Sequence, residues 1–125
     1  MSLETPIHRV EGLGAAHSGT QHFWRERITA VALVPLSIWF GFSAISLIGA
    51  QEFQVLTYFQ HWWNAGLMGL FVVIALAHQM IGIQSVVDDY VQQPGLKVLC
   101  LLLNRGFAWI VGLICIIALL RIAIG

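Results

Sequence analysis

The residues from Asn64 to Val87, NAGLMGLFVVIALAHQMIGIQSVV, are 24 consecutive positions without an Asp, Glu, Lys or Arg. A helix rises about 1.5 Å per residue, so a stretch of this length crosses the hydrocarbon core of a bilayer, which is about 30 Å thick. Lipid offers the backbone no hydrogen-bond partner, and a helix satisfies its own N–H and C=O groups. The stretch therefore predicts a transmembrane helix over residues 64–87.

Two further apolar stretches lie on either side of this helix. Residues 28–50 carry no charged side chain, and residues 98–124 carry only Arg105 and Arg121. Arg121 lies near the expected end of its helix, where a long side chain reaches the interface. We predict a transmembrane helix over each stretch. Arg105 leaves two alternatives open: it lies within the membrane and is paired, or the helix begins at this residue.

The composition excludes an ordinary soluble domain. Of the 125 residues, 58% are hydrophobic and 10% are charged, whereas soluble domains carry about 25% charged residues. A chain this short cannot bury so much apolar surface in one core, so the excess must face lipid. The zero net charge offers no basic surface to a nucleic acid, and two cysteines provide neither a disulfide framework nor a metal cluster. The sequence therefore predicts an all-α membrane protein with three transmembrane helices.

The segments outside the predicted spans set the orientation. They are the N-terminal residues 1–27 and the two connections, residues 51–63 and 88–97. Lys and Arg occur in the first and third segments, whereas the second has Glu52 and no basic residue; Pro94-Gly95 in the third is a turn signal. Cytoplasmic segments carry the excess of Lys and Arg. We therefore expect residues 1–27 and 88–97 in the cytoplasm and residues 51–63 in the periplasm. The basic residues are Arg9, Arg25, Arg27 and Lys97.

The N-terminal residues do not resemble a targeting signal. They lack the apolar core of a secretory leader, and Glu4 and Glu11 are atypical of an organellar transit peptide. We therefore expect a multi-pass protein of the bacterial inner (cytoplasmic) membrane, with its N-terminus in the cytoplasm. A mature organellar chain is the alternative.

His78 is the only histidine deep within a predicted span. An ionisable residue at that depth indicates a functional site. It shares a helix face with Ala75, Gly82 and Ser85, and small residues there allow a neighbouring helix or a flat ring system to approach closely. These surroundings suit an axial haem ligand, whereas the alternative is a neutral histidine hydrogen-bonded across helices. A bis-histidine haem would need its second histidine from another chain.

Polar residues gather near the expected cytoplasmic ends of the helices. Asp88-Asp89-Tyr90 can relay protons and hydrogen-bond a carbonyl ligand, and the alternative is a polar helix end with an interfacial tyrosine. Arg27 lies at the mouth of the first helix, where its guanidinium can pair with an anionic group. Ordinary positive-inside anchoring explains Arg27 equally well. His22 belongs to a mixed polar and aromatic segment, residues 21–27, that leads into the same helix.

Two motifs resemble those of the smaller hydrophobic membrane anchor of succinate dehydrogenase, the respiratory complex II. In that family a histidine in the second helix is followed by glycine four residues on and by Asp-Tyr eleven and twelve residues on. Counted from His78, those offsets land on Gly82, Asp89 and Tyr90. The segment Arg27-Ile-Thr-Ala30 is similar to the family's Arg-x-Thr-Ala at the start of helix one. The three-helix layout and the length match as well, so the resemblance covers essentially the whole chain.

The resemblance implies that this chain is half of a heterodimeric anchor bundle. The expected partners are a second hydrophobic anchor subunit (cytochrome b556-like), an iron–sulfur subunit, a flavoprotein subunit and the lipid membrane. The two anchors would share one haem b and help form a ubiquinone-reduction site. By this likeness His78 is the axial ligand of the haem iron, Arg27 and His22 lie near the haem, and Tyr90 and Asp89 bind quinone. The chain itself would have no catalytic residue, because succinate oxidation belongs to the flavoprotein.

Two other functions are compatible with the residues alone. One is a purely structural membrane anchor without haem or quinone, in which His78 only hydrogen-bonds across helices. The other is a small transporter subunit with His78 in a proton path. A transporter would need polar residues along the first and third helices, and the first offers little beyond Thr29 and three serines. The sequence therefore favours the anchor of a succinate:quinone oxidoreductase.

Overall fold

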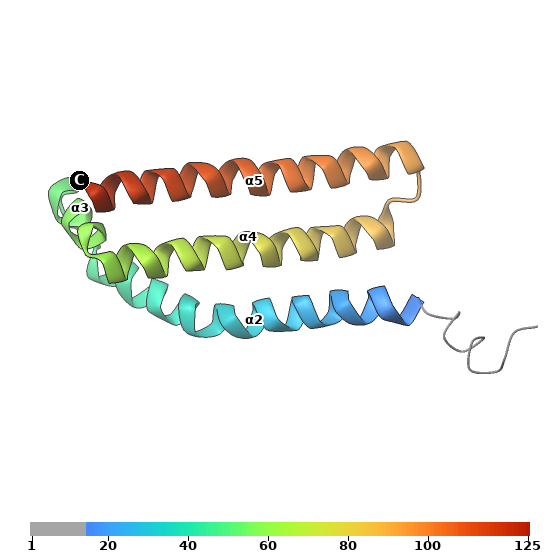
Figure 1. The fold of residues 1–125 in the computed structure, drawn as a ribbon, viewed down its shortest axis with the longest axis horizontal. Coiled ribbons are helices and arrows are strands. Elements are labelled where there is room, and N and C mark those ends of the chain that lie inside the picture. The colour runs from blue at the N-terminus through green and yellow to red at the C-terminus, as the bar shows by residue number, and fades with distance from the viewer. Residues whose placement is uncertain (1–14) are drawn as a thin grey trace, which may run out of the picture.

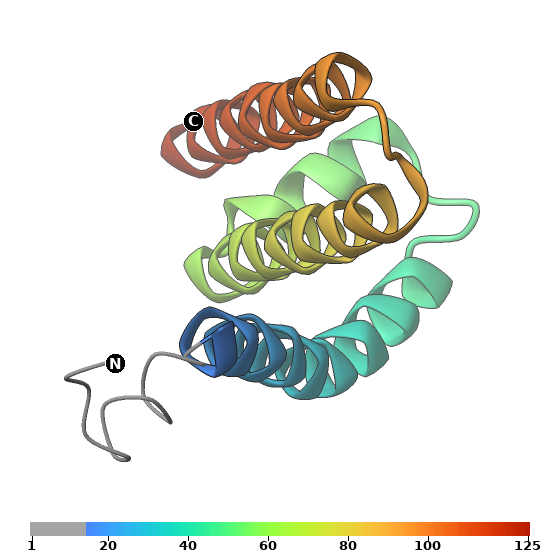
Figure 2. The same cartoon turned by 90° about the vertical axis from the view of Figure 1, so that its right-hand side faces the viewer.

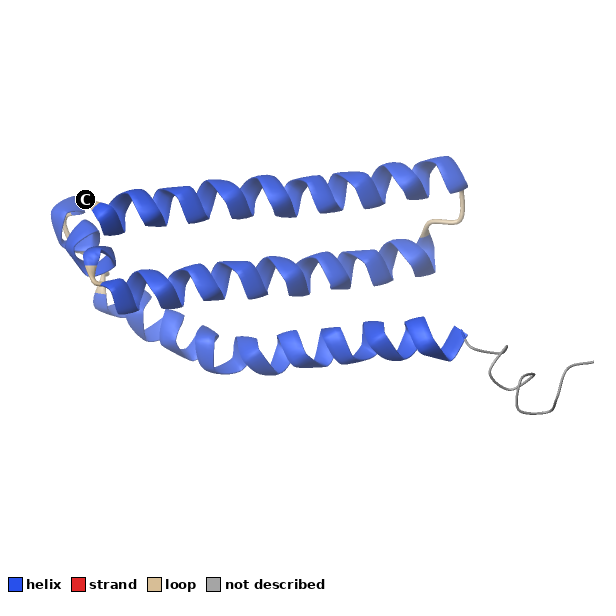
Figure 3. Ribbon diagram, viewed as in Figure 1, coloured by secondary structure: helices blue, strands red, loops and turns tan. Residues whose placement is uncertain are grey.

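Residues 15–125 form four helices, three of which are long and apolar enough to cross a membrane (Figures 1 and 3). The computed structural model describes the backbone of these residues and the side chains from Thr20 onward, and this part of the chain contains no strand. The predicted all-α class with three spans is confirmed. Residues 1–14, with Glu4, Arg9 and Glu11, lie outside the described residues. The helices are α2 (Ala15–Ser46), α3 (Glu52–Gln60), α4 (Trp62–Tyr90) and α5 (Pro94–Ile124).

The three long helices lie side by side, with α4 between α2 and α5 and packed against both (Figure 2). At one end of the bundle α2 begins, α4 ends and α5 begins, and we call this the N-terminal end. The short helix α3 and the C-terminus lie at the other end (Figure 1). This arrangement brings residues 20–29 of α2 next to the second half of α4, where the predicted site residues lie.

Few side chains are buried between the helices. Among the described residues the buried apolar side chains are Leu36, Val87 and Ala108, whereas most large apolar side chains are exposed. Three helices in a row leave each one a broad apolar surface, which in water would cause aggregation. In a membrane the same surface faces lipid tails or the helices of a partner subunit.

α2 is longer than the predicted span of residues 28–50, because it begins at Ala15. An uncharged stretch marks only the part of a helix that can lie in lipid. The helix can extend beyond that part, because charged residues such as Arg25-Glu26-Arg27 also adopt helical backbone readily. The last part of the predicted N-terminal segment therefore forms the first turns of α2. Pro35 lies inside this helix, which curves along its length (Figure 1), and a proline donates no hydrogen bond to the preceding turn.

The first connection contains α3, which lies across the far end of the bundle. Gly49 has a φ of +76°, a conformation that favours glycine and lets the chain leave α2. The backbone N–H of Gln51 donates a hydrogen bond of 2.8 Å to the side chain of Gln54, which caps the start of α3. The hydroxyl groups of Tyr58 and Ser43 lie 2.5 Å apart and join α3 to α2.

The second connection is short, because only residues 91–93 separate α4 from α5. Lys97 and Asp88 form an ion pair of 3.3 Å across it. Pro94-Gly95, which was predicted to form the turn, instead begins α5. Proline suits the first position of a helix, since its φ is already helical and its missing N–H would have had no partner there.

Candidate functional site

His78 lies between α4 and α2, where its Nδ1 atom is 2.9 Å from the hydroxyl of Thr29. Thr29 is the threonine of the Arg-x-Thr-Ala segment, so the structure brings the two motifs of the predicted site together. The imidazole is half-buried. Within the described residues its Nε2 atom makes no hydrogen bond, so this nitrogen is available to another group.

His22 makes a second contact between the same two helices, nearer the N-terminal end. Its Nε2 atom is 2.6 Å from the hydroxyl of Ser85, which also donates to the carbonyl of Ile81 at 3.2 Å. The sequence predicted His22 in a segment ahead of the helix, whereas it lies inside α2 and faces α4. His78 and Ser85 thus both face α2, from the side of α4 predicted to carry the small residues.

Asp89 and Tyr90 are the last two residues of α4, and both side chains are exposed. Tyr90 is 81% exposed, and neither side chain makes a hydrogen bond within residues 20–125. Their neighbour Asp88 is engaged with Lys97. Tyr90 comes about 18 Å beyond His78 along a continuous helix. The structure therefore separates a deep histidine from a free phenol at the N-terminal end of the bundle.

Arg27 is exposed and does not contact His78. Its guanidinium carbon lies 5.0 Å from the centre of the Phe23 ring, which is one turn earlier in α2. A cation over an aromatic face is favourable and leaves the N–H groups of the guanidinium free to bind an anion. Arg27 is therefore held on the outside of α2, where a partner or a cofactor can reach it.

The sequence did not reveal a polar contact that joins α4 to α5. The side-chain amide of Gln79 donates to Asn104 at 3.0 Å, and Asn104 donates to the backbone carbonyl of Met80 at 2.9 Å. Asn104 is only 6% exposed, and the Gln79 oxygen is buried without a partner. The only available signal was the occurrence of amide side chains within apolar stretches. Such bonds hold transmembrane helices together where the hydrophobic effect cannot.

Replacing Asn104 with Ala is expected to destabilise the packing of α5 on α4. The change removes both hydrogen bonds and leaves the Gln79 amide buried without its acceptor. A double-mutant cycle with Gln79→Ala should give a coupling of about 0.6 kcal/mol, the average for such pairs in membrane proteins. Thermal unfolding of the purified complex measures it. Additive effects of the two substitutions would show that the pair does not interact. Gln60→Ala is the control for losing an amide, because the exposed Gln60 side chain makes no hydrogen bond within residues 20–125.

Arg105 lies within α5, well after its first residue Pro94, so the helix does not begin at the arginine. Within residues 20–125 it also makes no ion pair. It lines a cleft of about 530 Å³ together with Arg25, His22 and Gln84. Neither alternative from the sequence therefore describes Arg105 fully: it is an exposed helical arginine that lines a cleft with both polar and apolar walls at the N-terminal half of the bundle.

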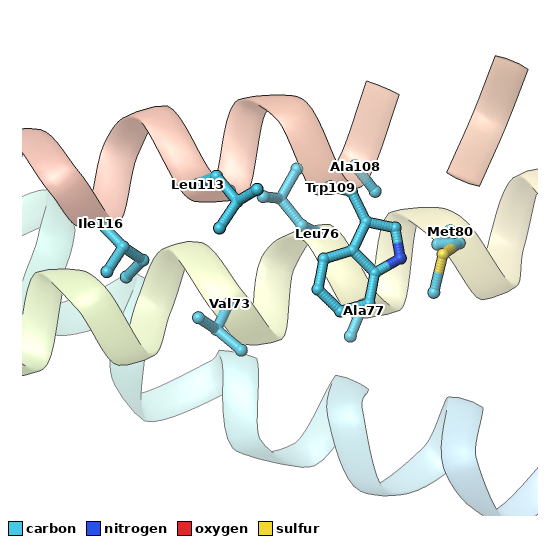
Figure 4. A pocket seen from close by; sticks show the side chains of 9 residues that line it. Val73, Leu76, Ala77, Met80, Ala108, Trp109, Leu113 and Ile116 are labelled. Carbon is cyan, nitrogen blue, oxygen red and sulfur yellow. The ribbon is translucent and has the colours of Figure 1, made fainter. Parts of the chain in front are cut away.

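A second cavity, of about 250 Å³, lies between α4 and α5 (Figure 4). Its lining is almost entirely apolar and includes Leu76 and Met80 from α4 and Trp109 and Leu113 from α5. The indole N–H of Trp109 is the one polar side-chain group among the lining residues (Figure 4). This cavity therefore fits an acyl chain or an apolar side chain of a partner better than a substrate.

The fold and the polar residues together define a class of protein. Among the described residues no three His, Cys, Asp or Glu side chains come close enough to hold a metal ion by themselves. The bundle has the imidazole of His78 between α2 and α4. It also has the exposed Asp89 and Tyr90 at its N-terminal end, and broad exposed apolar faces. The chain is a multi-pass helical membrane protein whose apolar faces can contact lipid or the helices of other subunits.

Comparison with known proteins identifies the family. The chain belongs to the succinate dehydrogenase/fumarate reductase transmembrane subunits, whose family model matches residues 1–120. The succinate dehydrogenase hydrophobic membrane anchor subunit of Paracoccus denitrificans is 36% identical over 125 residues, which is 100% of this chain and 96% of that protein. The predicted resemblance is therefore confirmed: the chain is a membrane anchor of succinate dehydrogenase and associates with the other subunits of that enzyme.

More distant relatives have the same description. The hydrophobic membrane anchor subunit from Rickettsia bellii is 28% identical over 85 residues, 68% of each chain. The membrane anchor subunit from Reclinomonas americana is 27% identical over 94 residues, 73% of this chain and 78% of that protein. No solved structure gives a significant match.

Proposed function

We propose that this anchor subunit provides one axial ligand of a haem b through Nε2 of His78, and that it contributes Tyr90 and Asp89 to a ubiquinone-reduction site. The observation that carries the proposal is the geometry of His78. Its Nδ1 atom is held by Thr29 at 2.9 Å, while its other nitrogen makes no hydrogen bond within the described residues. Histidines that bind metals are commonly held in this way, with one nitrogen bonded to the protein and the other left for the metal.

The surroundings of His78 fit a flat macrocycle. A Cβ atom added to Gly82, one turn further along α4, would meet nothing within 4 Å, so α4 leaves open space one turn beyond His78. The nitrogen of a neutral imidazole is a common axial ligand of haem iron. A bound haem would supply one-electron transfer. Because His78 is the only histidine deep in the spans, the second axial histidine is expected from the other anchor subunit.

The N-terminal end of the bundle fits a quinone head group. The Tyr90 hydroxyl is free to donate a hydrogen bond to a quinone carbonyl, and the adjacent Asp89 carboxylate can pass a proton. Arg27 and His22 lie near the start of α2 at the same end, where they can support the haem propionates. An iron–sulfur subunit on this side of the membrane would supply the electrons, and a flavoprotein subunit behind it would oxidise succinate.

The test is a reduced-minus-oxidised spectrum of the purified complex with its partner chains identified. A b-type haem spectrum together with a flavoprotein, an iron–sulfur protein and a second anchor supports the proposal. A complete complex without haem would leave His78 as a hydrogen-bonding residue between α2 and α4. Its contact with Thr29 would then be purely structural, as in the alternative function of a structural anchor.

The orientation in the bacterial inner membrane is part of the proposal and can be tested directly. Gln54 in α3 and Gln92 between α4 and α5 are both exposed and lie at opposite ends of the bundle. The excess of Lys and Arg at the N-terminal end predicts that this end is cytoplasmic. In a variant without Cys100 and Cys115, a cysteine at position 54 should therefore react with a membrane-impermeant reagent in spheroplasts. A cysteine at position 92 should react only after permeabilisation, and the reverse pattern would refute the orientation.

A further inference from the structure

The hydroxyl of Thr29 has three close neighbours but only one hydrogen to donate. It lies 2.8 Å from the carbonyl of Arg25, 3.0 Å from the carbonyl of Glu26 and 2.9 Å from Nδ1 of His78. A threonine inside a helix commonly donates to the carbonyl three or four residues earlier. When Thr29 donates in this way, its oxygen can only accept from His78, so the hydrogen between them belongs to the imidazole.

We propose that Thr29 is a positioning residue that holds His78 as the Nδ1–H tautomer. This inference rests on the proposed haem function and deepens it. A neutral imidazole has one N–H and one nitrogen with a free lone pair. With the hydrogen on Nδ1 and bonded to Thr29, the lone pair lies on Nε2, which is the nitrogen left free for iron.

The geometry gives Thr29 two further effects on the ligand. A β-branched side chain in a helix has few rotamers, so the Thr29 oxygen is held in place and fixes the plane of the imidazole. An acceptor on Nδ1–H also makes Nε2 a stronger donor to the metal, as residues behind metal ligands usually do. A stronger donor stabilises ferric over ferrous haem. A hydroxyl does this without adding a charge between α2 and α4.

The opposite hydrogen-bond direction has different chemistry, which makes the inference testable. If Thr29 donated to Nδ1 instead, the imidazole would carry its hydrogen on Nε2 and could not bind iron through that atom. Removing the hydroxyl would then remove an obstacle to ligation rather than a support for it. The two directions therefore predict opposite effects of the same substitution.

The experiment measures the haem midpoint potential in the purified four-subunit complex. Thr29→Val keeps the shape of the side chain and removes only the hydroxyl. We expect the ferric-over-ferrous preference to fall about tenfold, which corresponds to a rise in potential of about 59 mV for a one-electron couple. The low-spin electron paramagnetic resonance signal should broaden, because the imidazole plane is no longer fixed. Thr29→Ser, which keeps the hydroxyl, should restore most of both properties.

Thr57 provides a matched control in the same chain. Its hydroxyl donates to the carbonyl of Phe53 at 2.7 Å, the same local bond that Thr29 makes, but no imidazole is bonded to it. Thr57→Val should leave the haem potential unchanged. If Thr29→Val prevents assembly, Thr29→Ala is the second variant, because it also lacks the hydroxyl and has a smaller side chain. We expect the same rise in haem midpoint potential in Thr29→Ala.

The outcomes separate this inference from the proposed function. An unchanged or lowered potential in Thr29→Val, in a complex whose low-spin haem is lost on His78→Ala, would overturn the role of Thr29 and leave haem ligation intact. A low-spin haem that survives His78→Ala would overturn the proposed haem ligation and this inference with it. A raised potential that Thr29→Ser reverses supports both.

Discussion

Replacing His78 with Ala is expected to abolish the low-spin b-type haem spectrum of the assembled complex. The substitution removes the one deep imidazole of this chain, together with its contact to Thr29. Haem iron with a single axial histidine becomes high-spin or the haem is lost, and we expect haem affinity to fall at least about tenfold. Optical and electron paramagnetic resonance spectra of the purified complex measure the change. Quinone reduction can persist, since the haem need not lie on the shortest electron path.

His61→Ala is the matched control for this substitution. His61 is exposed at the start of α4, where its Nδ1 atom accepts a hydrogen bond of 3.3 Å from the backbone of Trp63. It lies at the opposite end of the bundle from Tyr90, so its loss should leave the haem spectrum unchanged. The flavin-linked oxidation of succinate with an artificial acceptor should survive in both variants. An unchanged low-spin spectrum in an assembled His78→Ala complex would exclude His78 as the ligand.

The three spans were predictable because they depend on local composition. A long stretch without charge, such as residues 64–87, has one stable form in lipid. The ends of the helices were less predictable. The start of α2 at Ala15 was missed because charged residues such as Arg25 form helix outside the lipid as readily as apolar residues do within it. For the same reason His22 was expected outside the helix that contains it.

The sequence showed that His78 lies within an uncharged stretch, but it did not show the contacts of the imidazole. Thr29 is far from it in the chain, and only the packing of α2 on α4 brings the two together. The bond between Gln79 and Asn104 likewise depends on how α5 is rotated against α4. No spacing rule within one helix predicts either pair. The assignments of Tyr90 and Asp89 depend on partner subunits, so they rest on the likeness of the motif and on exposure.

Tyr90→Phe is expected to separate the quinone site from the haem site. Tyr90 is 81% exposed and makes no hydrogen bond within residues 20–125, so removing its hydroxyl breaks no contact inside this chain. It lies about 18 Å along α4 from His78, which leaves the proposed haem ligand undisturbed. Assembly and the haem spectrum should therefore be normal. Any change in turnover can then be attributed to the lost phenol hydrogen bond.

The expected change in turnover follows from where charge develops on the substrate. In the proposed site, a carbonyl oxygen of the quinone would gain negative charge as electrons arrive, so a hydrogen bond from Tyr90 would strengthen along the reaction and stabilise the transition state. We expect succinate:quinone activity of Tyr90→Phe to fall about tenfold or more, while succinate oxidation by an acceptor that takes electrons from the flavin is untouched. Tyr58→Phe is the control, because the Tyr58 hydroxyl bonds to Ser43 at the opposite end of the bundle and its loss should leave quinone turnover unchanged. Wild-type rates in Tyr90→Phe across a range of quinone concentrations would show that Tyr90 is only an interfacial residue.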